Sequence, residues 1–412
     1  MNPPAGPGVL APFRTRNYRR QWIGDLATSW AFEMEVLILG WYVLVATESV
    51  FWLSIFGALH YLGTLFAPGF GVVGDRIGLR NLLCLMRATY AILSGTMALL
   101  LATDQATLPL IFGIAALLGV VRPSDIGVRS GLVASIVPAG QLNGALALSR
   151  TTFDTARVFG ALAGTGLFAA FGIAAAYGLV TACYVLGLLL TLSINAPAQA
   201  SKKELRSPFR DLLDGLNYIW RTPHVQAVMW LAFLANFSAF PISLGLMPYI
   251  AKNVYGLDQT GLGLLVASFA AGAFLGSVVL ATTRNAIMPG RLMIKASVFW
   301  HLSLLIFAFT TNRWAGMGLL LTAGFMQSLS MLPLMFILLR TTEPEIRGRI
   351  MGVRMLAIYS LPIGLMLAGI LIPRIGYVAT AGGYAALGIV LTAAIGFRWR
   401  RSIWASNAAA NG

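Results

Sequence analysis

Long apolar runs separated by short polar stretches dominate this chain of 412 residues. A helix of about 20 apolar residues spans the hydrocarbon core of a membrane. Because backbone amides find no water in that core, each run must form a helix, and the runs are too long and too uniformly apolar for barrel strands. The pattern predicts twelve transmembrane helices, over residues 21–46, 51–73, 82–103, 107–135, 144–171, 173–195, 225–250, 261–283, 293–311, 314–339, 350–373 and 377–398.

Composition supports a membrane protein and argues against a soluble enzyme. Hydrophobic residues make up 58% of the chain and charged residues only 10%, whereas globular domains carry about 25% charged residues. The mean hydropathy is +0.78. The two cysteines, Cys84 and Cys183, lie inside apolar runs, which indicates core residues and no disulfide framework.

The only long polar stretch lies halfway along the chain, at residues 196–223. It contains DLLDGLNYIW, which is typical of an amphipathic helix at a membrane surface. We therefore expect an all-α integral membrane protein with two pseudo-symmetric six-helix bundles. The expected segments are a cytoplasmic tail at 1–20, an N-terminal bundle at 21–195, a cytoplasmic linker at 196–223, a C-terminal bundle at 224–400 and a cytoplasmic tail at 401–412.

An internal repeat supports two related bundles. Residues 138–172 and 344–376 align at a constant offset of 204, with four identities in one frame. Parallel repeats are a transporter architecture in which the substrate site lies between the halves. The matched pairs are Gly144 with Gly348, Arg150 with Arg354, Gly160 with Gly364, and Gly172 with Gly376.

The formal charge is +15, and the positions of the basic residues along the chain predict its membrane topology. With a cytoplasmic N-terminus, nearly all arginines and lysines that lie outside the predicted spans fall on the cytoplasmic side, and only Lys252, Arg313 and Arg374 fall on the outer side, as the positive-inside rule requires. We expect both termini in the cytoplasm and an inner-membrane location. The basic residues are scattered over short loops, which argues against nucleic-acid binding. The Pro/Gly-rich start, residues 1–12, precedes a full-length span and does not resemble a cleaved signal peptide.

The loop after the second predicted span carries a recognisable motif, Gly71-Val-Val-Gly-Asp-Arg-Ile-Gly-Leu-Arg80. It resembles the loop signature G-x-x-x-D-R-x-G-R-R of the major facilitator superfamily, and Leu79 departs from it where the family prefers a basic residue. The segments at 18–44 and 122–160 resemble the enterobactin-exporter-like branch of drug and siderophore efflux proteins. The matching motif residues are Gly71, Asp75, Arg76, Gly78 and Arg80.

The resemblance implies the major facilitator fold and a conformational latch at this loop. Gly71 and Gly78 allow close approach and a tight turn. Asp75 can accept hydrogen bonds at a helix N-terminus near Arg349, which would stabilise an outward-facing state. Arg76 and Arg80 can pair with acidic residues or anionic lipid.

Acidic residues within the predicted spans occur only in the first half of the chain. Charges at membrane depth are costly and mark transport pathways. Glu33 and Glu35 lie deepest, and their side chains point about 200° apart on a helix, so only one is expected to face a cavity, and the residues leave open which. Burial favours the neutral form of a carboxyl group, which suits proton uptake and release. The predicted proton-coupling residues are Glu33, Glu35, Asp25 and Asp154.

Three further side chains are candidates for substrate or charge interactions: Arg122, Trp30 and His60. Arg122 could pair with a glutamate of the first span or attract an anionic substrate. Two other pairs could satisfy each other on one helix, Asp125 with Arg129 and Asp154 with Arg157. His301 is expected to be peripheral.

The chain shows no Walker loop, no metal-ligand cluster and no catalytic set, so no cofactor and no enzymatic activity are expected. The predicted function is proton-driven export of a small amphiphilic molecule, such as a siderophore or drug, by alternating access. An importer or lysolipid flippase of the same fold is the main alternative, and a membrane-embedded enzyme or a receptor is remote. The expected partners are a small-molecule substrate, protons and the lipid bilayer, and the chain is expected to act as a monomer.

Overall fold

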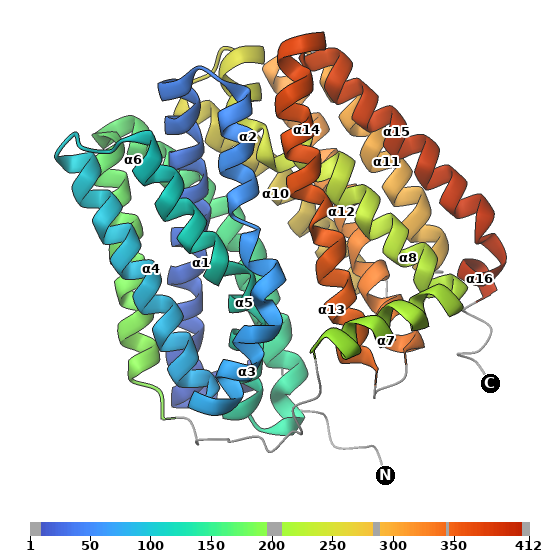
Figure 1. Ribbon diagram of the computed structural model, residues 1–412, viewed down its shortest axis with the longest axis horizontal. Coiled ribbons are helices and arrows are strands. Elements are labelled where there is room, and N and C mark those ends of the chain that lie inside the picture. The colour runs from blue at the N-terminus through green and yellow to red at the C-terminus, as the bar shows by residue number, and fades with distance from the viewer. Residues whose placement is uncertain (1–9, 196–207, 283–288, 343–345, 406–412) are drawn as a thin grey trace. The chain divides into compact units, whose positions relative to one another are not determined.

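The computed structural model describes residues 10–195, 208–282, 289–342 and 346–405. Within these ranges the chain is helical and has no β-strand, which confirms the predicted all-α class (Figure 1). Parts of the predicted tails and linker, at 1–9, 196–207 and 406–412, lie outside the described residues. The α-helices are α1 (Arg16–Thr47), α2 (Val50–Leu59), α3 (Ala67–Ile77), α4 (Leu79–Ala102), α5 (Leu108–Ile136), α6 (Leu142–Leu192), α7 (Pro208–Arg221), α8 (Pro223–Leu234), α9 (Met247–Tyr249), α10 (Gln259–Thr282), α11 (Pro289–Phe309), α12 (Arg313–Thr341), α13 (Arg347–Ile358), α14 (Ser360–Ile375), α15 (Tyr377–Arg398) and α16 (Arg400–Ala405).

Ten helical stretches of the described chain are long and apolar enough to cross a membrane. One of them, Gly144–Leu192, has 49 residues, about twice the length that one crossing needs. Its helix α6 is interrupted at Gly172, where φ is 82° and ψ is 172°. Counting α6 as two crossings, and adding one through the shorter apolar stretch that begins at Val50, would raise these ten to the predicted twelve.

The second predicted span is broken rather than continuous. A 3-10 segment, η2 (Leu62–Phe66), separates α2 from α3. Proline at the start of α3 lacks the amide that a continuing helix would use, which explains the interruption. Gly78, with φ of 86°, then provides the turn between α3 and α4 that the motif predicted.

The seventh predicted span is also irregular. After α8 the chain continues through three π-helical segments, η4 (Ala235–Ala239), η5 (Pro241–Gly245) and η6 (Ile250–Val254). Prolines at 241 and 248 lie at the starts of η5 and α9. π-Helical turns inside membrane helices are frequent at functional sites.

The chain divides into two compact units. The first comprises Met1–Tyr42 and Leu59–Lys203, in which α4 and α5 pack together and α6 packs along α4. Gly63 and Gly119 bring α5 into backbone contact with η2 and with the end of α2, because a β-carbon at Gly63 would overlap Val120 and one at Gly119 would overlap the Leu59 carbonyl.

The second unit comprises Val43–Ala58 and Glu204–Gly412. Its helices α10, α11 and α12 pack together, and α15 packs along α11. Residues 43–58 belong to this unit by their contacts: a β-carbon at Gly369 of α14 would lie 2.6 Å from the Ser54 hydroxyl of α2.

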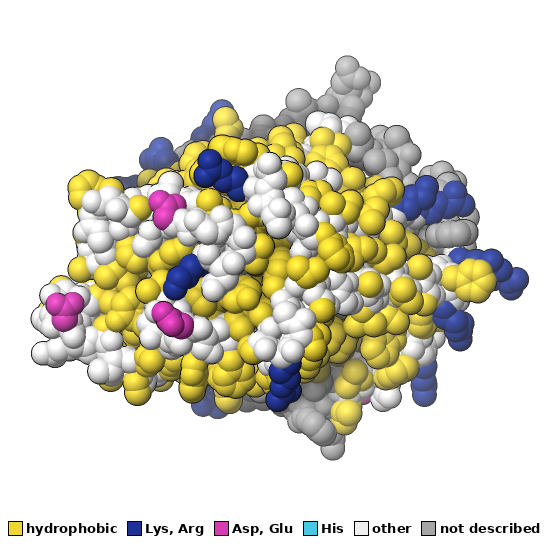
Figure 2. Space-filling view, turned by 90° about the horizontal axis from the view of Figure 1, so that it is seen from above, with side chains coloured by type: hydrophobic (Ala, Val, Ile, Leu, Met, Phe, Trp, Pro, Cys, Tyr) yellow, Lys and Arg dark blue, Asp and Glu magenta, His cyan; other side chains and the backbone are white. Residues whose placement is uncertain are grey.

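Much of the molecular surface is apolar, as a lipid-facing surface requires. Figure 2 looks onto the ends of the helices, and even there hydrophobic side chains are widely visible among white atoms and a few charged side chains. The amphipathic helix α7 carries Trp220 exposed on its surface and pairs Asp214 with Arg349 at 3.1 Å. Several large side chains are more than 60% exposed: Ile92, Leu99, Phe171, Val390 and Phe397.

Candidate functional site

Glu35 lies at the centre of a buried polar cluster in the first unit. Its side chain is 0% exposed. Arg122 of α5 pairs with it at 2.5 Å. Two tyrosine hydroxyls of α6 donate to the same carboxylate, Tyr177 to Oε1 at 2.5 Å and Tyr184 to Oε2 at 2.8 Å. Three donors from two helices therefore hold one carboxylate that would be unstable alone in this environment.

Arg122 links several groups around that carboxylate. Its Nη2 also donates to the Tyr184 hydroxyl at 2.9 Å. Its guanidinium lies 3.5 Å from the centre of the Phe32 ring, a cation–π contact. Arginine suits this site because it stays charged and its planar group can bind carboxylate and ring at once.

Glu33 faces a different partner from Glu35. Its carboxylate lies 3.6 Å from Arg157 Nε of α6. Gly160 allows this approach, because a β-carbon there would come within 3.1 Å of Glu33 Cβ. The predicted pairing of Asp154 with Arg157 is wrong: Asp154 pairs with Arg150, one turn earlier, at 3.1 Å. Arg157 instead compensates Glu33, which would otherwise be a buried charge without a partner.

A second charged cluster lies nearer the N-terminal end of α1. Asp25 forms an ion pair with Arg87 of α4 and lies 3.5 Å from Arg129 Nε of α5. Arg129 pairs with Asp125, as predicted, and its Nη1 donates to Ser29 Oγ at 2.9 Å. The cluster contains two acids and two arginines from three helices, so its charges balance.

Sequence reasoning missed Arg87, Tyr177 and Tyr184. Arg87 is 0% exposed and donates to the Gly187 carbonyl at 3.0 Å. An arginine at the sixth position of the predicted span 82–103 is itself a signal, since such a charge needs an acidic partner. The tyrosines gave no comparable signal, because buried tyrosines are common in any core.

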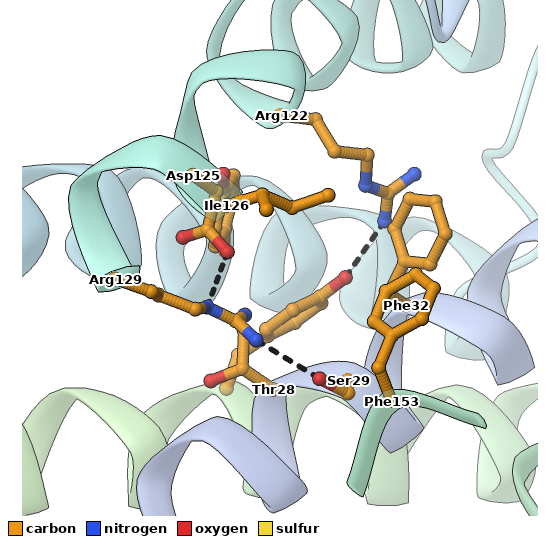
Figure 3. A pocket seen from close by; sticks show the side chains of 10 residues that line it. Thr28, Ser29, Phe32, Arg122, Asp125, Ile126, Arg129 and Phe153 are labelled. Carbon is orange, nitrogen blue, oxygen red and sulfur yellow. Dashed lines mark hydrogen bonds and ion pairs between the residues drawn. The ribbon is translucent and has the colours of Figure 1, made fainter. Parts of the chain in front are cut away.

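A small cavity separates the two clusters (Figure 3). Its volume is about 80 Å³, well below the several hundred Å³ of a drug-sized pocket. Arg122 and Arg129 approach it from α5, while Phe32, Thr28 and Ser29 approach from α1. The lining residues are Thr28, Ser29, Phe32, Tyr90, Arg122, Asp125, Ile126, Arg129, Phe153 and Tyr184.

Four polar atoms of cavity-lining side chains have no hydrogen-bond partner among the described residues. They are the Tyr90 hydroxyl, Arg122 Nη1, Asp125 Oδ1 and Arg129 Nε, and the last of these lies in the ion pair with Asp125. Tyr90 is 2% exposed and Asp125 is 5% exposed. Buried polar groups of this kind are normally satisfied by ordered water or by a ligand.

The other predicted site residues lie apart from this cavity. Trp30 stacks against Phe159 with ring centres 6.2 Å apart, and His60 is buried near the junction of α2 and η2. Asp75 and Arg76 are exposed at the end of α3. Arg80 Nη1 donates to Asn81 at 2.9 Å, and its Nη2 donates to the Leu192 carbonyl.

The second unit presents a different polar feature. His301 of α11 is fully buried, so the prediction of a peripheral position is wrong. Its Nδ1 lies 2.8 Å from the Ser297 carbonyl and its Nε2 lies 3.0 Å from Ser238 Oγ in η4. Gly388 of α15 leaves space for the ring, because a β-carbon there would overlap it. Gly388 on the neighbouring helix thus leaves room for the His301 ring. The apolar pattern of α11 gives no sign of this arrangement.

Among the described residues, no group of three or more His, Cys, Asp or Glu side chains is arranged to hold a metal ion. The carboxylates described above instead form ion pairs with arginines and accept hydrogen bonds from tyrosines. The chemistry that this arrangement can perform is exchange of protons and of ion-pair partners.

The sequence of this chain is similar to those of known proteins. The family model described as "Transmembrane secretion effector" matches residues 7–411. The multidrug efflux pump Tap of Mycolicibacterium fortuitum is 25% identical over 319 residues, covering 71% of this chain and 76% of Tap. The enterobactin exporter EntS of Escherichia coli O1:K1 is 26% identical over 234 residues, covering 56% of this chain and 55% of EntS.

Solved structures show the same fold at low identity. A POT family transporter crystallised with 5-aminolevulinic acid superposes with a TM-score of 0.76 and is 11% identical. The match covers 94% of this chain and 97% of the transporter. At that identity the likeness establishes the fold alone.

Proposed function

Because the chain belongs to the transmembrane secretion effector family and is a membrane transporter of the major facilitator type, we propose that it is a proton-driven exporter of small amphiphilic molecules that works by alternating access. The two curated relatives are named as an efflux pump and an exporter, which supports outward transport. Their names, multidrug and enterobactin, support an amphiphilic substrate.

The observation that carries the proton-coupling proposal is the buried Glu35–Arg122 pair. A buried carboxylate is stable while its cation and hydrogen-bond donors stay in place. Protonation of Glu35 removes the attraction for Arg122 and frees the guanidinium. Because protonation and pairing with Arg122 compete for the same carboxylate, a rearrangement of Arg122 is linked to protonation of Glu35, as coupling requires.

The membrane potential supplies enough energy for one proton to shift the equilibrium between two transport states. One charge that moves through 100 mV gains about 2.3 kcal/mol. That is comparable with the differential stabilisation needed to shift a two-state equilibrium by more than tenfold. Glu33 with Arg157, and Asp25 and Asp154 with their arginines, remain secondary candidates for the same role. The proposal also includes a latch between transport states, formed by Asp75, which is exposed near the end of α3, and by the motif around it.

The proposal is tested with purified protein in proteoliposomes that carry a proton gradient. The probes are ethidium, Hoechst 33342 and enterobactin, and a pH-sensitive dye reports proton movement. We expect wild-type protein to expel at least one probe against its gradient and to move protons in the opposite direction. Glu35→Gln should abolish gradient-driven efflux and leave downhill exchange measurable.

Glu33→Gln is the matched comparison, because it changes a glutamate of the same helix that lies outside the Arg122 pair. It should retain more gradient-driven efflux than Glu35→Gln. Uptake in place of efflux would contradict export. Undiminished concentrative efflux by Glu35→Gln would contradict the assignment of coupling to this pair.

A further inference from the structure

The cavity between the two charged clusters has a chemistry suited to water rather than to substrate. Its volume of about 80 Å³ holds several water molecules and no amphiphile. Its wall offers the donors and acceptors that water needs, since the Tyr90 hydroxyl, Arg122 Nη1 and Asp125 Oδ1 have no other partner among the described residues.

The cavity is open at one edge. Ile126 belongs to its lining and is 59% exposed. The cavity therefore reaches the surface of the first unit at this side chain, whereas Glu35 itself does not line the cavity and is fully buried. A proton that reaches Glu35 from the cavity must cross an intervening side chain.

Tyr184 is placed to be that side chain. It lines the cavity, it accepts a hydrogen bond from Arg122 Nη2, and its hydroxyl donates to Glu35 Oε2 at 2.8 Å. Tyr177 donates to the same carboxylate at 2.5 Å and does not line the cavity. The two tyrosines are seven residues apart on α6, so they share a helix face and differ in their access to the cavity.

We propose that this cavity is a hydrated proton-access site that delivers protons to Glu35 through the Tyr184 hydroxyl. A hydronium ion in the cavity gives a proton to the Tyr184 oxygen as the original hydroxyl proton passes to Glu35 Oε2. The hydronium becomes water, the tyrosine stays neutral, and the carboxylate becomes a neutral acid. The inference rests on the proposed function, because it supplies the route for the proton that drives export.

The groups that face this route come from four helices. Glu35 is met by Arg122, Tyr177 and Tyr184, and Tyr90 of α4 packs against Tyr184 with ring centres 5.4 Å apart. On the other side of the cavity Asp125 is held by Arg129, which also reaches Asp25, the partner of Arg87. The cavity wall itself carries two arginines and one aspartate. Glu35, Asp25 and Arg87 behind the wall bring the six charged groups to neutrality, so the region as a whole does not repel an added proton.

The test compares Tyr184→Phe with Tyr177→Phe in proteoliposomes. Each removes one hydroxyl that donates to Glu35 and keeps the aromatic ring. The measured quantities are the initial rate of substrate-induced proton movement, its dependence on pH and on D₂O, and the rate of downhill substrate exchange. We expect Tyr184→Phe to move protons at least about tenfold more slowly than Tyr177→Phe. We expect both variants to retain exchange.

A second pair of variants tests the cavity without changing a tyrosine. Thr28 lines the cavity and is 2% exposed. Thr28→Leu adds apolar volume there, whereas Thr28→Val keeps nearly the same volume. We expect Thr28→Leu to slow proton movement more than Thr28→Val does, with exchange retained by both.

The outcomes separate the inference from the function on which it depends. If wild-type protein exports substrate without moving protons, the proton-driven function fails and the inference fails with it. If wild-type protein moves protons and the two tyrosine variants are equally slow, only the inference is overturned. Two other results would also overturn the inference alone. Loss of both exchange and proton movement in Tyr184→Phe would give Tyr184 a structural role. Unchanged proton movement in Thr28→Leu would show that protons do not pass through the cavity.

Discussion

Charge balance explains which residues can be buried in the first unit. Each acidic side chain within its spans has an arginine partner: Asp25 has Arg87, Glu33 has Arg157, Glu35 has Arg122, Asp125 has Arg129, and Asp154 has Arg150. A lone charge at this depth would cost several kcal/mol. Pairing makes the charges tolerable at this depth.

The pair of Asp25 and Arg87 should be the most sensitive to removal of one partner. Arg87 is fully buried, so Asp25→Asn leaves a buried cation with weakened compensation. We expect the free energy of unfolding to fall by about 3 kcal/mol. The measurement is the midpoint of thermal unfolding in detergent.

Two further variants make that result specific. Adding Arg87→Gln to Asp25→Asn should restore part of the lost stability, because the unpaired charge is then gone. Asp214→Asn breaks an exposed pair between α7 and α13, with the acid side chain 56% exposed, and should cost less than about 1 kcal/mol. Equal losses from Asp25→Asn and Asp214→Asn would show that burial does not set the cost.

Part of the site was predictable from single residues. Glu33, Glu35 and Arg122 stood out because a charge within an apolar run is rare, and Arg122 does pair with one of the two glutamates. The choice of Glu35 could not be predicted, because it depends on how α5 and α6 meet α1. Tyr177 and Tyr184 are 142 and 149 residues away from Glu35, so no local pattern connects them.

At the scale of helices, the internal repeat is visible in backbone geometry. Gly172 and Gly376, matched at an offset of 204, have nearly the same conformation, with φ of 82° and 84° and ψ of 172° and 162°. Each ends one membrane helix and begins the next. Gly160 and Gly364, matched at the same offset, bring α6 against α1 and α14 against η4.

These two turns should tolerate only glycine. Their φ and ψ values fall in a region that side chains avoid, at a cost of about 1–3 kcal/mol for a non-glycine residue. We expect Gly172→Ala and Gly376→Ala each to lower the unfolding midpoint by a similar amount. Gly178→Ala is the control, because Gly178 lies within α6 and a β-carbon there meets open space. A stabilising effect of alanine at 172 or 376 would contradict the turn assignment.

The apolar pattern located the helices well and their irregularities poorly. Hydropathy records how long a segment is apolar, which is the property that a membrane span requires. It does not record where a hydrogen-bond ladder breaks. The interruption between Leu59 and Ala67 and the π-helical segments from 235 to 254 depend on prolines and on packing against neighbouring helices.

At the scale of the whole molecule, the intramembrane acids lie in the first unit, while the spans of the second contain none. This asymmetry agrees with the proposal that protons act on the first unit, which the Glu35–Arg122 pair carries. The allocation of residues 43–58 to the second unit was not predictable, because it arises from contacts such as that of Ser54 with Gly369, 315 positions later in the chain.

Topology is the property of the whole chain that the arginine distribution predicts most directly. The twelve-crossing arrangement places both termini in the cytoplasm and requires α6 to cross the membrane twice. A helix of 51 residues would extend about 77 Å if it were straight, against about 30 Å of hydrocarbon. The break at Gly172 should therefore lie on the outer side of the membrane.

Reporter insertions test this arrangement directly, because alkaline phosphatase is active only outside and green fluorescent protein fluoresces only inside the cytoplasm. We expect fluorescence from fusions after Asn195 and after Ala405, and phosphatase activity from fusions after Asp104 and after Gly172. The Gly172 position is decisive, since a single crossing through α6 would put it within the membrane and an odd number of crossings would put Ala405 outside. Fluorescence at Gly172, or phosphatase activity at Ala405, would overturn the twelve-helix topology and with it the placement of the arginine-rich loops in the cytoplasm.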